Sequence, residues 1–353
     1  MRLAAAVTAA SALGVAGCGG DDDKDDGAQT ARPAAGSDLG AIKTYLLQHT
    51  QQLNDDVAAL RRDAEAYHAL AGQAGFDYDR LLETQRERIS ALIERSQEGF
   101  RRANPAYEEM EGVVAGVPEL ADFDVSIDAG GDASDPENAV SFSIKTPAGN
   151  TFKQPGNFNF LVETSLFGTE PRFAAKVVKP DLDGDGRVEF GEALPDADFY
   201  VAAVRDFAKT TAELDRAARA WEPTLQDALT ALVVMTPTMS EYFEAWKNSR
   251  FIAGDEAKEK AFVAASRLQD IADILGGLVL VYDSVQPAVA KADAQQARET
   301  ADALRSLRGF AARLRDQEAD GKRFDAQDAE TLGGEAQSQA EAIAGQVCRP
   351  PPG

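Results

Sequence analysis

Residues 39–67 read LGAIKTYLLQHTQQLNDDVAALRRDAEAY, and their apolar side chains recur at steps of three, four and seven. The repeating positions are Ile42, Leu46, Leu53, Val57, Leu60, Ala64 and Tyr67. This spacing places them on one face of an α-helix, while polar side chains cover the opposite face. The stretch therefore predicts an amphipathic helix of about 30 residues, whose apolar face must pack against other helices.

Comparable periodicities follow along most of the chain. A second amphipathic helix is predicted over residues 81–100, and a shorter helix restarts at Pro105. Later helices are expected at 158–167, 197–220, 223–235, 237–250, 255–286, 288–317 and 325–346. Pro237 and Pro287 are expected to mark boundaries, because proline lacks the N–H that a helix interior needs.

Residues 116–156 have a different pattern. Glycine, aspartate, asparagine and proline punctuate them, and residues 140–145 (VSFSIK) alternate like a short strand. Long amphipathic helices joined by short connections pack as antiparallel bundles. The sequence therefore predicts an all-α domain over residues 38–346, with two antiparallel helical bundles and an irregular, partly β middle connection.

The composition excludes one class of partner. The chain has 353 residues and a formal net charge of −23. This length is enough for one large or two modest domains with an ample core. Because so acidic a chain repels a phosphate backbone, nucleic acid is not expected as a partner, whereas cations are attracted.

The first residues resemble an export signal. Arg2 precedes a short apolar run at 3–15, which is shorter than the roughly 20 residues that span a bilayer. The run ends in Val-Ala-Gly-Cys at 15–18, which looks like the lipobox of bacterial lipoproteins. Residues 1–17 are then a lipoprotein signal peptide, Cys18 carries the lipid, and residues 18–37 form a disordered acidic tether. We expect an exported protein, lipid-anchored to the cell membrane of a bacterial envelope; the alternative is an ordinary signal peptide with a chance cysteine.

Residues 181–192 read DLDGDGRVEFGE and match the twelve-position calcium loop of the EF-hand. Carboxylates stand at positions 1, 3, 5 and 12, position 7 offers its carbonyl, and position 9 acts through water. The expected ligands are Asp181, Asp183, Asp185, Arg187 through its carbonyl, Glu189 and Glu192. Because all donors are oxygens, Ca²⁺ is the expected cofactor. The alternative is a solvated acidic surface loop.

Two features separate this loop from a calcium sensor. Pro180 precedes position 1 and disfavours an incoming helix, and the sequence shows no second loop of this type. A helix is expected only on the exit side, from Asp196 onward. The segment 177–200 is therefore predicted to be an ion-fixed connector between helical bundles, not a switch.

Three segments carry a family resemblance. They are the acidic segment 120–129 (LADFDVSIDA), the helix at 158–168 (FNFLVETSLFG), and AGDE at 253–256 with Ser266 and Asp270. These segments resemble the imelysin-like proteins, in particular the iron-uptake lipoproteins of the Efe type, over roughly residues 38–346. The resemblance implies a helical binding protein of the cell envelope that captures a metal ion or a small ligand, with iron as a candidate.

The second segment departs from the family's pattern, which is Gly-x-His-x-x-Glu followed by an aromatic residue. Glu163 keeps the glutamate, but Phe160 stands in place of the histidine and Phe158 in place of the glycine. Because phenylalanine cannot bind a metal, the resemblance leaves only Glu163 as a ligand from this motif. The alternative for Glu163 is a buried carboxylate satisfied by an arginine such as Arg172.

No enzyme is expected. The chain shows no nucleophile motif, phosphate-binding glycine loop, zinc-protease signature or paired catalytic carboxylates. Its two histidines, His49 and His68, point about 100° apart on the first helix and so cannot share a site unaided. The competing classes are a structural or interaction lipoprotein, in which calcium only stabilises a loop, and a residual hydrolase. Carboxylates near Glu163 in the fold favour the binding protein, and their absence favours the structural one.

Overall fold

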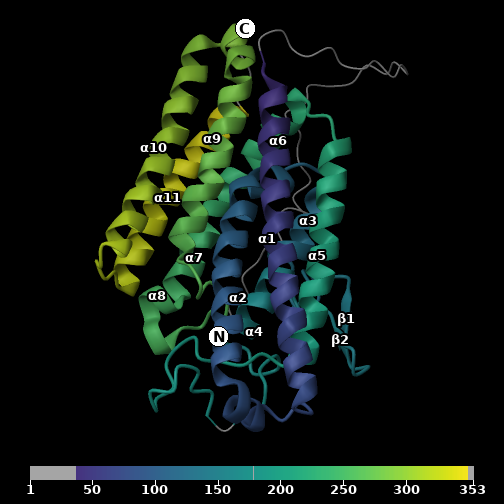
Figure 1. The fold of residues 1–353 in the computed structure, drawn as a ribbon. Helices are drawn as coiled ribbons and strands as arrows, with labels where there is room; N and C mark the ends of the chain where they lie inside the picture. The colour runs from purple at the N-terminus through teal and green to yellow at the C-terminus, as the bar shows by residue number, and fades with distance from the viewer. Residues whose placement is uncertain (1–36, 178, 349–353) are drawn as a thin grey trace.

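The computed structural model describes residues 37–177 and 179–348, and over these residues the fold is all-α, as predicted. Figure 1 shows long helices running side by side. They are α1 (Leu39–Gln73), α2 (Tyr78–Val114), α5 (Ala197–Ala220), α6 (Leu225–Met235), α7 (Met239–Asn248), α9 (Arg267–Ala292), α10 (Ala294–Ala319) and α11 (Ala326–Val347). The predicted signal peptide, the predicted lipidation site Cys18 and nearly all of the predicted acidic tether lie outside the described residues.

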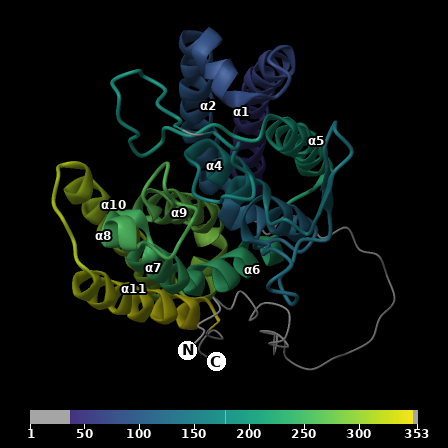
Figure 2. The ribbon, with the colours of Figure 1, turned by 90° about the horizontal axis from the view of Figure 1, so that it is seen from below.

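The long helices form two groups. In the first group α1 packs on α2 and α5, and in the second α9 packs on α10 while α11 packs on α7 and α10. The contact between α2 and α9 joins the two groups. Figure 2 looks along the helices and shows one group on each side. This arrangement corresponds to the two bundles expected from the sequence. Among the described helices, none is long and apolar enough to cross a bilayer.

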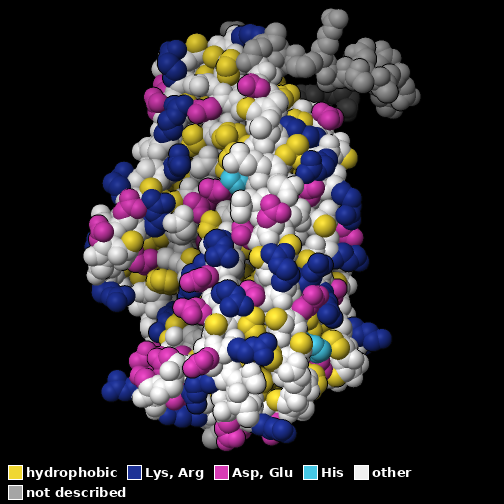
Figure 3. Space-filling view, viewed as in Figure 1, with side chains coloured by type: hydrophobic (Ala, Val, Ile, Leu, Met, Phe, Trp, Pro, Cys, Tyr) yellow, Lys and Arg dark blue, Asp and Glu magenta, His cyan; other side chains and the backbone are white. Residues whose placement is uncertain are grey.

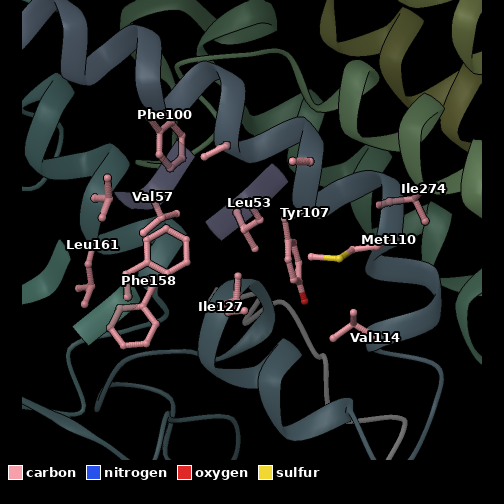
Figure 4. Packing of buried hydrophobic residues seen from close by; sticks show 14 of the residues in the cluster. Leu53, Val57, Phe100, Tyr107, Met110, Val114, Ile127, Phe158, Leu161 and Ile274 are labelled. Carbon is pink, nitrogen blue, oxygen red and sulfur yellow. The ribbon is translucent and has the colours of Figure 1, made fainter. Parts of the chain in front are cut away.

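Helix α1 shows how the apolar stripe builds the core. Asp38 caps its first turn by accepting the N–H of Ala41 at 3.1 Å. All seven predicted stripe positions are buried, at 2% exposure or less. They join one continuous core with residues of α2, α4 and α9, seen in Figure 4 around Leu53, Tyr107 and Phe158. Each buried leucine or phenylalanine in this core contributes about 1.5–3 kcal/mol.

Two predicted helix breaks do not occur. α2 continues through Pro105, and α9 continues through Pro287. A proline inside a helix lowers the stability of that helix by about 3 kcal/mol. The helix can still continue where tertiary packing stabilises the residues on both sides of the proline. Ala106 and Tyr107, directly after Pro105, are buried in the core. Packing between the bundles therefore overrides the local preference.

The segment 255–266 was predicted to be helical, and this prediction is wrong. The short helix α8 (Arg250–Ala253) is followed by a 3₁₀ turn that ends at Glu256 (Gly254–Glu256), and α9 begins only after Ser266, whose hydroxyl caps the helix. Residues 257–266 are non-helical, and Phe262 has a φ of 55°. The physical reason lies elsewhere in the chain, because the N–H groups of residues 262–264 are bound by the Glu163 side chain.

The middle connection contains more structure than the sequence predicted. Strands β1 (Ser143–Lys145) and β2 (Thr151–Lys153) form an antiparallel hairpin, and β1 lies within the strand predicted at 140–145. Helix α3 (Ala121–Asp124) and a π-helical turn (Val125–Ala129) were not predicted. Helix α4 (Phe158–Phe167) has the predicted bounds, because Asn157 caps its start and Gly168, with a φ of 69°, ends it.

Candidate metal centre

Three buried carboxylates meet where the two helix groups join. Glu108 and Glu111 lie on α2, and Asp128 lies on the π-helical turn. One oxygen atom of each lies within 4.8 Å of the others. Glu108 is fully buried, Glu111 is 2% exposed, and the Asp128 side chain is 6% exposed. We call these three residues the carboxylate cluster.

Local structure explains how the cluster forms. Glu108 and Glu111 are three residues apart on α2, so their side chains share a helix face. Two hydrogen bonds hold the π-helical turn opposite that face. The Tyr107 hydroxyl donates to Asp124 Oδ1 at 2.6 Å, and Asn159 Nδ2 of α4 donates to Asp128 Oδ1 at 3.0 Å. Segments far apart in the sequence therefore bring the three carboxylates together.

A single guanidinium neutralises part of this charge. Arg267, at the start of α9, lies 2.9 Å from Asp270 Oδ2, 3.6 Å from Glu108 Oε1 and 3.5 Å from Asp128 Oδ2. Its planar group also lies over two aromatic rings, those of Phe262 at 3.9 Å and Tyr242 at 4.1 Å. Its side chain is 7% exposed. The charge of one arginine faces more carboxylates than it can balance.

The excess of buried carboxylates shows in their pKa values. Burial raises the pKa of Glu108 well above its ordinary value, and the nearby carboxylates of Asp270 and Asp128 raise it further. Burial, followed by the charge of Asp128, raises the pKa of Glu111 to about 7. Near neutral pH the cluster therefore either holds protons or is balanced by a further positive charge.

Several polar atoms of the carboxylate cluster and of Arg267 beside it have no hydrogen-bond partner within the described part of the chain. They are both carboxylate oxygens of Glu108, Oε2 of Glu111 and Nε of Arg267. An unsatisfied buried polar group costs about 1–3 kcal/mol, and a charged one costs more. Buried polar atoms that lower the stability of the fold in this way point to a functional site, such as one that binds an ion.

The donor set fits a hard metal ion. Such ions bind oxygens at about 2.0–2.6 Å, so two oxygens that share an ion lie at most about 5 Å apart. The cluster meets this limit and offers carboxylate oxygens with free lone pairs. Ca²⁺, Mg²⁺, Mn²⁺ and iron accept such ligands, whereas no thiolate or imidazole is among the three ligands of the cluster for a softer metal.

Glu163, the predicted ligand of the family motif, lies outside this cluster. Its side chain is 4% exposed, and its carboxylate accepts the N–H groups of Phe262 at 2.6 Å, Val263 at 2.9 Å and Ala264 at 2.8 Å. Burial raises the pKa of Glu163 to about 7, although the three N–H groups act in the opposite direction. The alternative, a buried carboxylate, is the better description, but its partners are backbone N–H groups and not Arg172.

Arg172 has other partners. Its guanidinium pairs with Asp132 at 2.8 Å and with Glu170 at 3.2 Å. Lys260 pairs with the same Glu170 at 2.7 Å. Through Glu170, these ion pairs connect the chain just after α4 to Lys260 in the segment 257–266. Glu163 binds the same segment through the N–H groups of that segment.

A cavity of about 450 Å³ links Glu163 to the carboxylate cluster. Both Glu163 and Asp128 line it, and so do Phe160 and Phe262. Its acidic lining residues are Asp128, Asp132, Asp135, Glu163, Glu170 and Glu259. Carboxylates therefore do gather near Glu163.

The loop 181–192 brings three of its six predicted ligands together. Oxygen atoms of Asp181, Asp183 and Asp185 lie within 4.8 Å of one another. Glu192 folds back across the loop, and its carboxylate accepts the N–H groups of positions 2, 3 and 9 at 2.8, 3.1 and 2.7 Å. Gly186 at position 6 has a φ of 93°, which permits the sharp turn. The side chains of positions 7 and 9 are exposed.

The surroundings of the loop agree with a connector. No helix precedes Pro180 in the residues that the structure describes around it, and Asp196 caps α5 on the exit side. Arg86 of α2 donates to the Asp181 carbonyl, and Ser90 donates to the Leu182 carbonyl. The Arg86 guanidinium also lies 3.5 Å from Asp181 Oδ1. The loop is thereby fastened to α2.

The two histidines each pair with a carboxylate of their own. His49 Nδ1 lies 2.9 Å from Glu109 Oε2, and His68 Nε2 lies 2.7 Å from Asp198 Oδ1. Figure 3 shows histidine side chains well apart on this face. Neither of them belongs to the carboxylate cluster or to the cavity lining.

Sequence reasoning did not single out Glu108, Glu111 and Arg267. A signal was available, because Glu-x-x-Glu at 108–111 places two carboxylates on one face of a predicted helix. The acidic segment 120–129, which supplies Asp128, was singled out for its resemblance. What the sequence lacked was the orientation of that helix face toward the segment.

Comparison with known proteins gives two results. No curated protein matches the chain. A model of the imelysin family matches residues 41–347, which include nearly all of α1 and extend to the end of α11. The chain therefore belongs to the imelysin family.

Proposed function

We propose that this protein is a binding protein of the cell envelope that captures a metal cation in the carboxylate cluster. The observation that carries the proposal is the set of buried carboxylate oxygens on Glu108 and Glu111 without hydrogen-bond partners, within 4.8 Å of Asp128. Burying such charges is expensive unless a cation compensates them. The position of the cluster at the junction of the two bundles gives a ligand contacts with both.

Iron is the candidate cation. The cluster offers only oxygen ligands, which suit hard cations including iron. Membership of the imelysin family, together with the resemblance to iron-uptake lipoproteins, supports this choice. The residues that would hold the ion are Glu108, Glu111 and Asp128.

We further propose that calcium in the loop 181–192 braces the fold. The three aspartates and the returning Glu192 are the oxygen ligands that Ca²⁺ takes in EF-hand loops. The loop contacts two helices far apart in the sequence, because Phe190 stacks on Phe167 of α4 and its ring centroid lies 3.5 Å from the Arg250 guanidinium of α8. An extracellular loop of this kind is expected to bind with a dissociation constant of about 10⁻⁴ to 10⁻³ M.

Location and chemistry complete the proposal. The lipobox at residues 15–18 supports export and a lipid anchor on Cys18. A peptidase is not proposed, because Phe160 stands where the family motif has its histidine. The second candidate is a structural or interaction lipoprotein. The five acidic side chains that line the cavity together with Glu163 favour the binding protein over it.

Calorimetric titration tests the metal site. The calcium-loaded protein is titrated anaerobically with ferrous iron, beside the variants Glu108→Gln and Glu98→Gln. Glu98 is an exposed residue of the same helix and serves as the matched control. We expect iron to bind the wild type and the control, and to bind Glu108→Gln at least about tenfold more weakly. Equal binding to all three proteins, or no binding to the wild type, contradicts the proposal.

A further inference from the structure

The cavity in front of the carboxylate cluster is much larger than a metal ion needs. Its volume is about 450 Å³, whereas one water molecule takes about 30 Å³ of liquid volume. Pockets for small organic ligands have volumes of about 300–1,000 Å³. The cavity thus has the size of an organic molecule.

Its walls combine aromatic rings with negative charge. Phe100, Phe160 and Phe262 supply the rings. Six acidic side chains face three basic ones, Arg172, Lys258 and Lys260, so the lining carries an excess of three negative charges when all are ionised. Aromatic faces and carboxylates together attract organic cations, whose positive group is more weakly hydrated than a metal ion.

One lining carboxylate is free to receive a cation. Glu170 and Asp132 are paired with basic side chains, and Glu163 is occupied by three N–H groups. By contrast, the Glu259 carboxylate has no hydrogen-bond or ion-pair partner among the residues that the structure describes, where only its backbone N–H is bonded, to the Asn248 carbonyl. Burial raises the pKa of Glu259, although the positive charge of Arg267 acts in the opposite direction.

A cationic side chain of the protein itself lies beside the cavity and is contacted by groups of the same kind. The Arg267 guanidinium lies between the rings of Phe262 and Tyr242, at 3.9 and 4.1 Å from their centroids. It also pairs with Asp128, which lines the cavity. The same residue types, and two of the same residues, therefore already hold a guanidinium at this end of the cavity.

From this geometry we infer that the cavity is a binding site for an organic cation, a small amine or polyamine. Glu259 supplies the counter-charge, and Phe100, Phe160 and Phe262 form the apolar walls. The inference goes beyond metal capture, because it concerns the cavity and Glu259 and not the lone pairs of Glu108 and Glu111.

Calorimetry of the calcium-loaded protein tests the inference with spermidine and putrescine as probes. Butane-1,4-diol, a neutral analogue of putrescine, and succinate, an anionic one, are the comparison ligands. The amines are expected to bind, and neither comparison ligand is. Glu259→Gln is expected to weaken amine binding about tenfold, and Lys258→Gln to strengthen it about twofold, through the changed charge of the lining.

Glu256→Gln is the matched control, because Glu256 is exposed on the same segment and does not line the cavity. It is expected to bind amines as the wild type does. No amine binding, equal binding of the diol, or equal losses in Glu259→Gln and Glu256→Gln overturns the inference. Iron titration of the same proteins separates the two claims. Iron binding without amine binding supports metal capture and overturns the amine site. Amine binding without iron binding supports the amine site and contradicts metal capture.

Discussion

Glu163 shows what one motif residue does when its metal-binding neighbour is absent. With Phe160 in the place of the histidine, the Glu163 carboxylate accepts three consecutive N–H groups and fixes the segment 257–266 against α4. That segment carries Phe262 and Glu259 to the cavity and leads into Arg267. Glu163 therefore positions the cavity wall through the backbone.

Removing the Glu163 carboxylate should destabilise the protein. Glu163→Ala leaves three N–H groups without an acceptor, and we expect a loss of about 2–4 kcal/mol in the free energy of unfolding. Urea denaturation followed by circular dichroism measures it. Glu163→Gln should lose less, because its amide oxygen still accepts. Glu137→Ala, an exposed glutamate of the middle connection, should stay within about 0.5 kcal/mol of the wild type. Unchanged stability of Glu163→Ala contradicts the assigned role.

Glu163 also predicts how stability depends on pH. Its pKa is about 7 in the folded protein and 4.5 in the reference state, so the folded protein binds the proton more tightly. The free energy of unfolding should therefore fall as pH rises from about 4.5 to about 7, by at most about 1.4 kcal/mol per unit for this group, and level off above. Denaturation curves between those limits should show a shallower slope for Glu163→Gln. Parallel slopes for the two proteins contradict the prediction.

Among the elements, helices whose ends are set by local capping residues were predicted correctly, whereas a segment held by a distant residue was not. The predicted bounds 158–167 and 197–220 agree with α4 and α5, because capping residues and apolar spacing act locally. The prediction for the segment 255–266 was wrong because the conformation of this segment depends on Glu163, which lies 99 positions away from Phe262. No local pattern contains that contact.

The candidate site could be predicted only in part, for a similar reason. Asp128 and Asp270 lie in segments that the resemblance singled out. Glu108 and Glu111 lie on a helix that also carries exposed glutamates such as Glu98. Spacing alone cannot tell which of these carboxylates faces Asp128, because the choice is made by the packing of α2 on α9.

The loop 181–192 makes a prediction at the scale of one element. Calcium at ten times its dissociation constant should add about 1.4 kcal/mol to the stability of the folded state, since it binds that state selectively. Differential scanning calorimetry should show a rise of a few degrees in Tm for the wild type. Glu192→Gln should lose most of the rise, and Glu189→Gln, which alters a water-mediated ligand, should lose less. A Tm that calcium does not change supports a solvated acidic loop instead.

At the scale of the whole molecule, the negative net charge of the chain bears on how cations reach the cavity. The two helix groups meet at a buried acidic junction, and the chain as a whole carries a formal charge of −23. Such a chain attracts cations over its entire surface, which raises their local concentration at the cavity. A lipid anchor would hold this acidic protein at the membrane.

The anchor is tested by fractionating cells that express the protein. The wild type should be recovered with the membranes, and Cys18→Ser should not, because a serine cannot carry the lipid. Cys348→Ser, at the other cysteine, should stay with the membranes. A wild type found in the soluble fraction, or Cys18→Ser found with the membranes, contradicts the anchor.

Metal capture by the carboxylate cluster is tested most directly by anomalous diffraction at the iron edge. Crystals of the calcium-loaded protein are exposed to ferrous iron without oxygen, and data are collected on both sides of the edge. The account predicts an iron peak between the side chains of Glu108, Glu111 and Asp128, and no such peak in Glu108→Gln. Iron found only in the loop 181–192, or at no position in the protein, contradicts it.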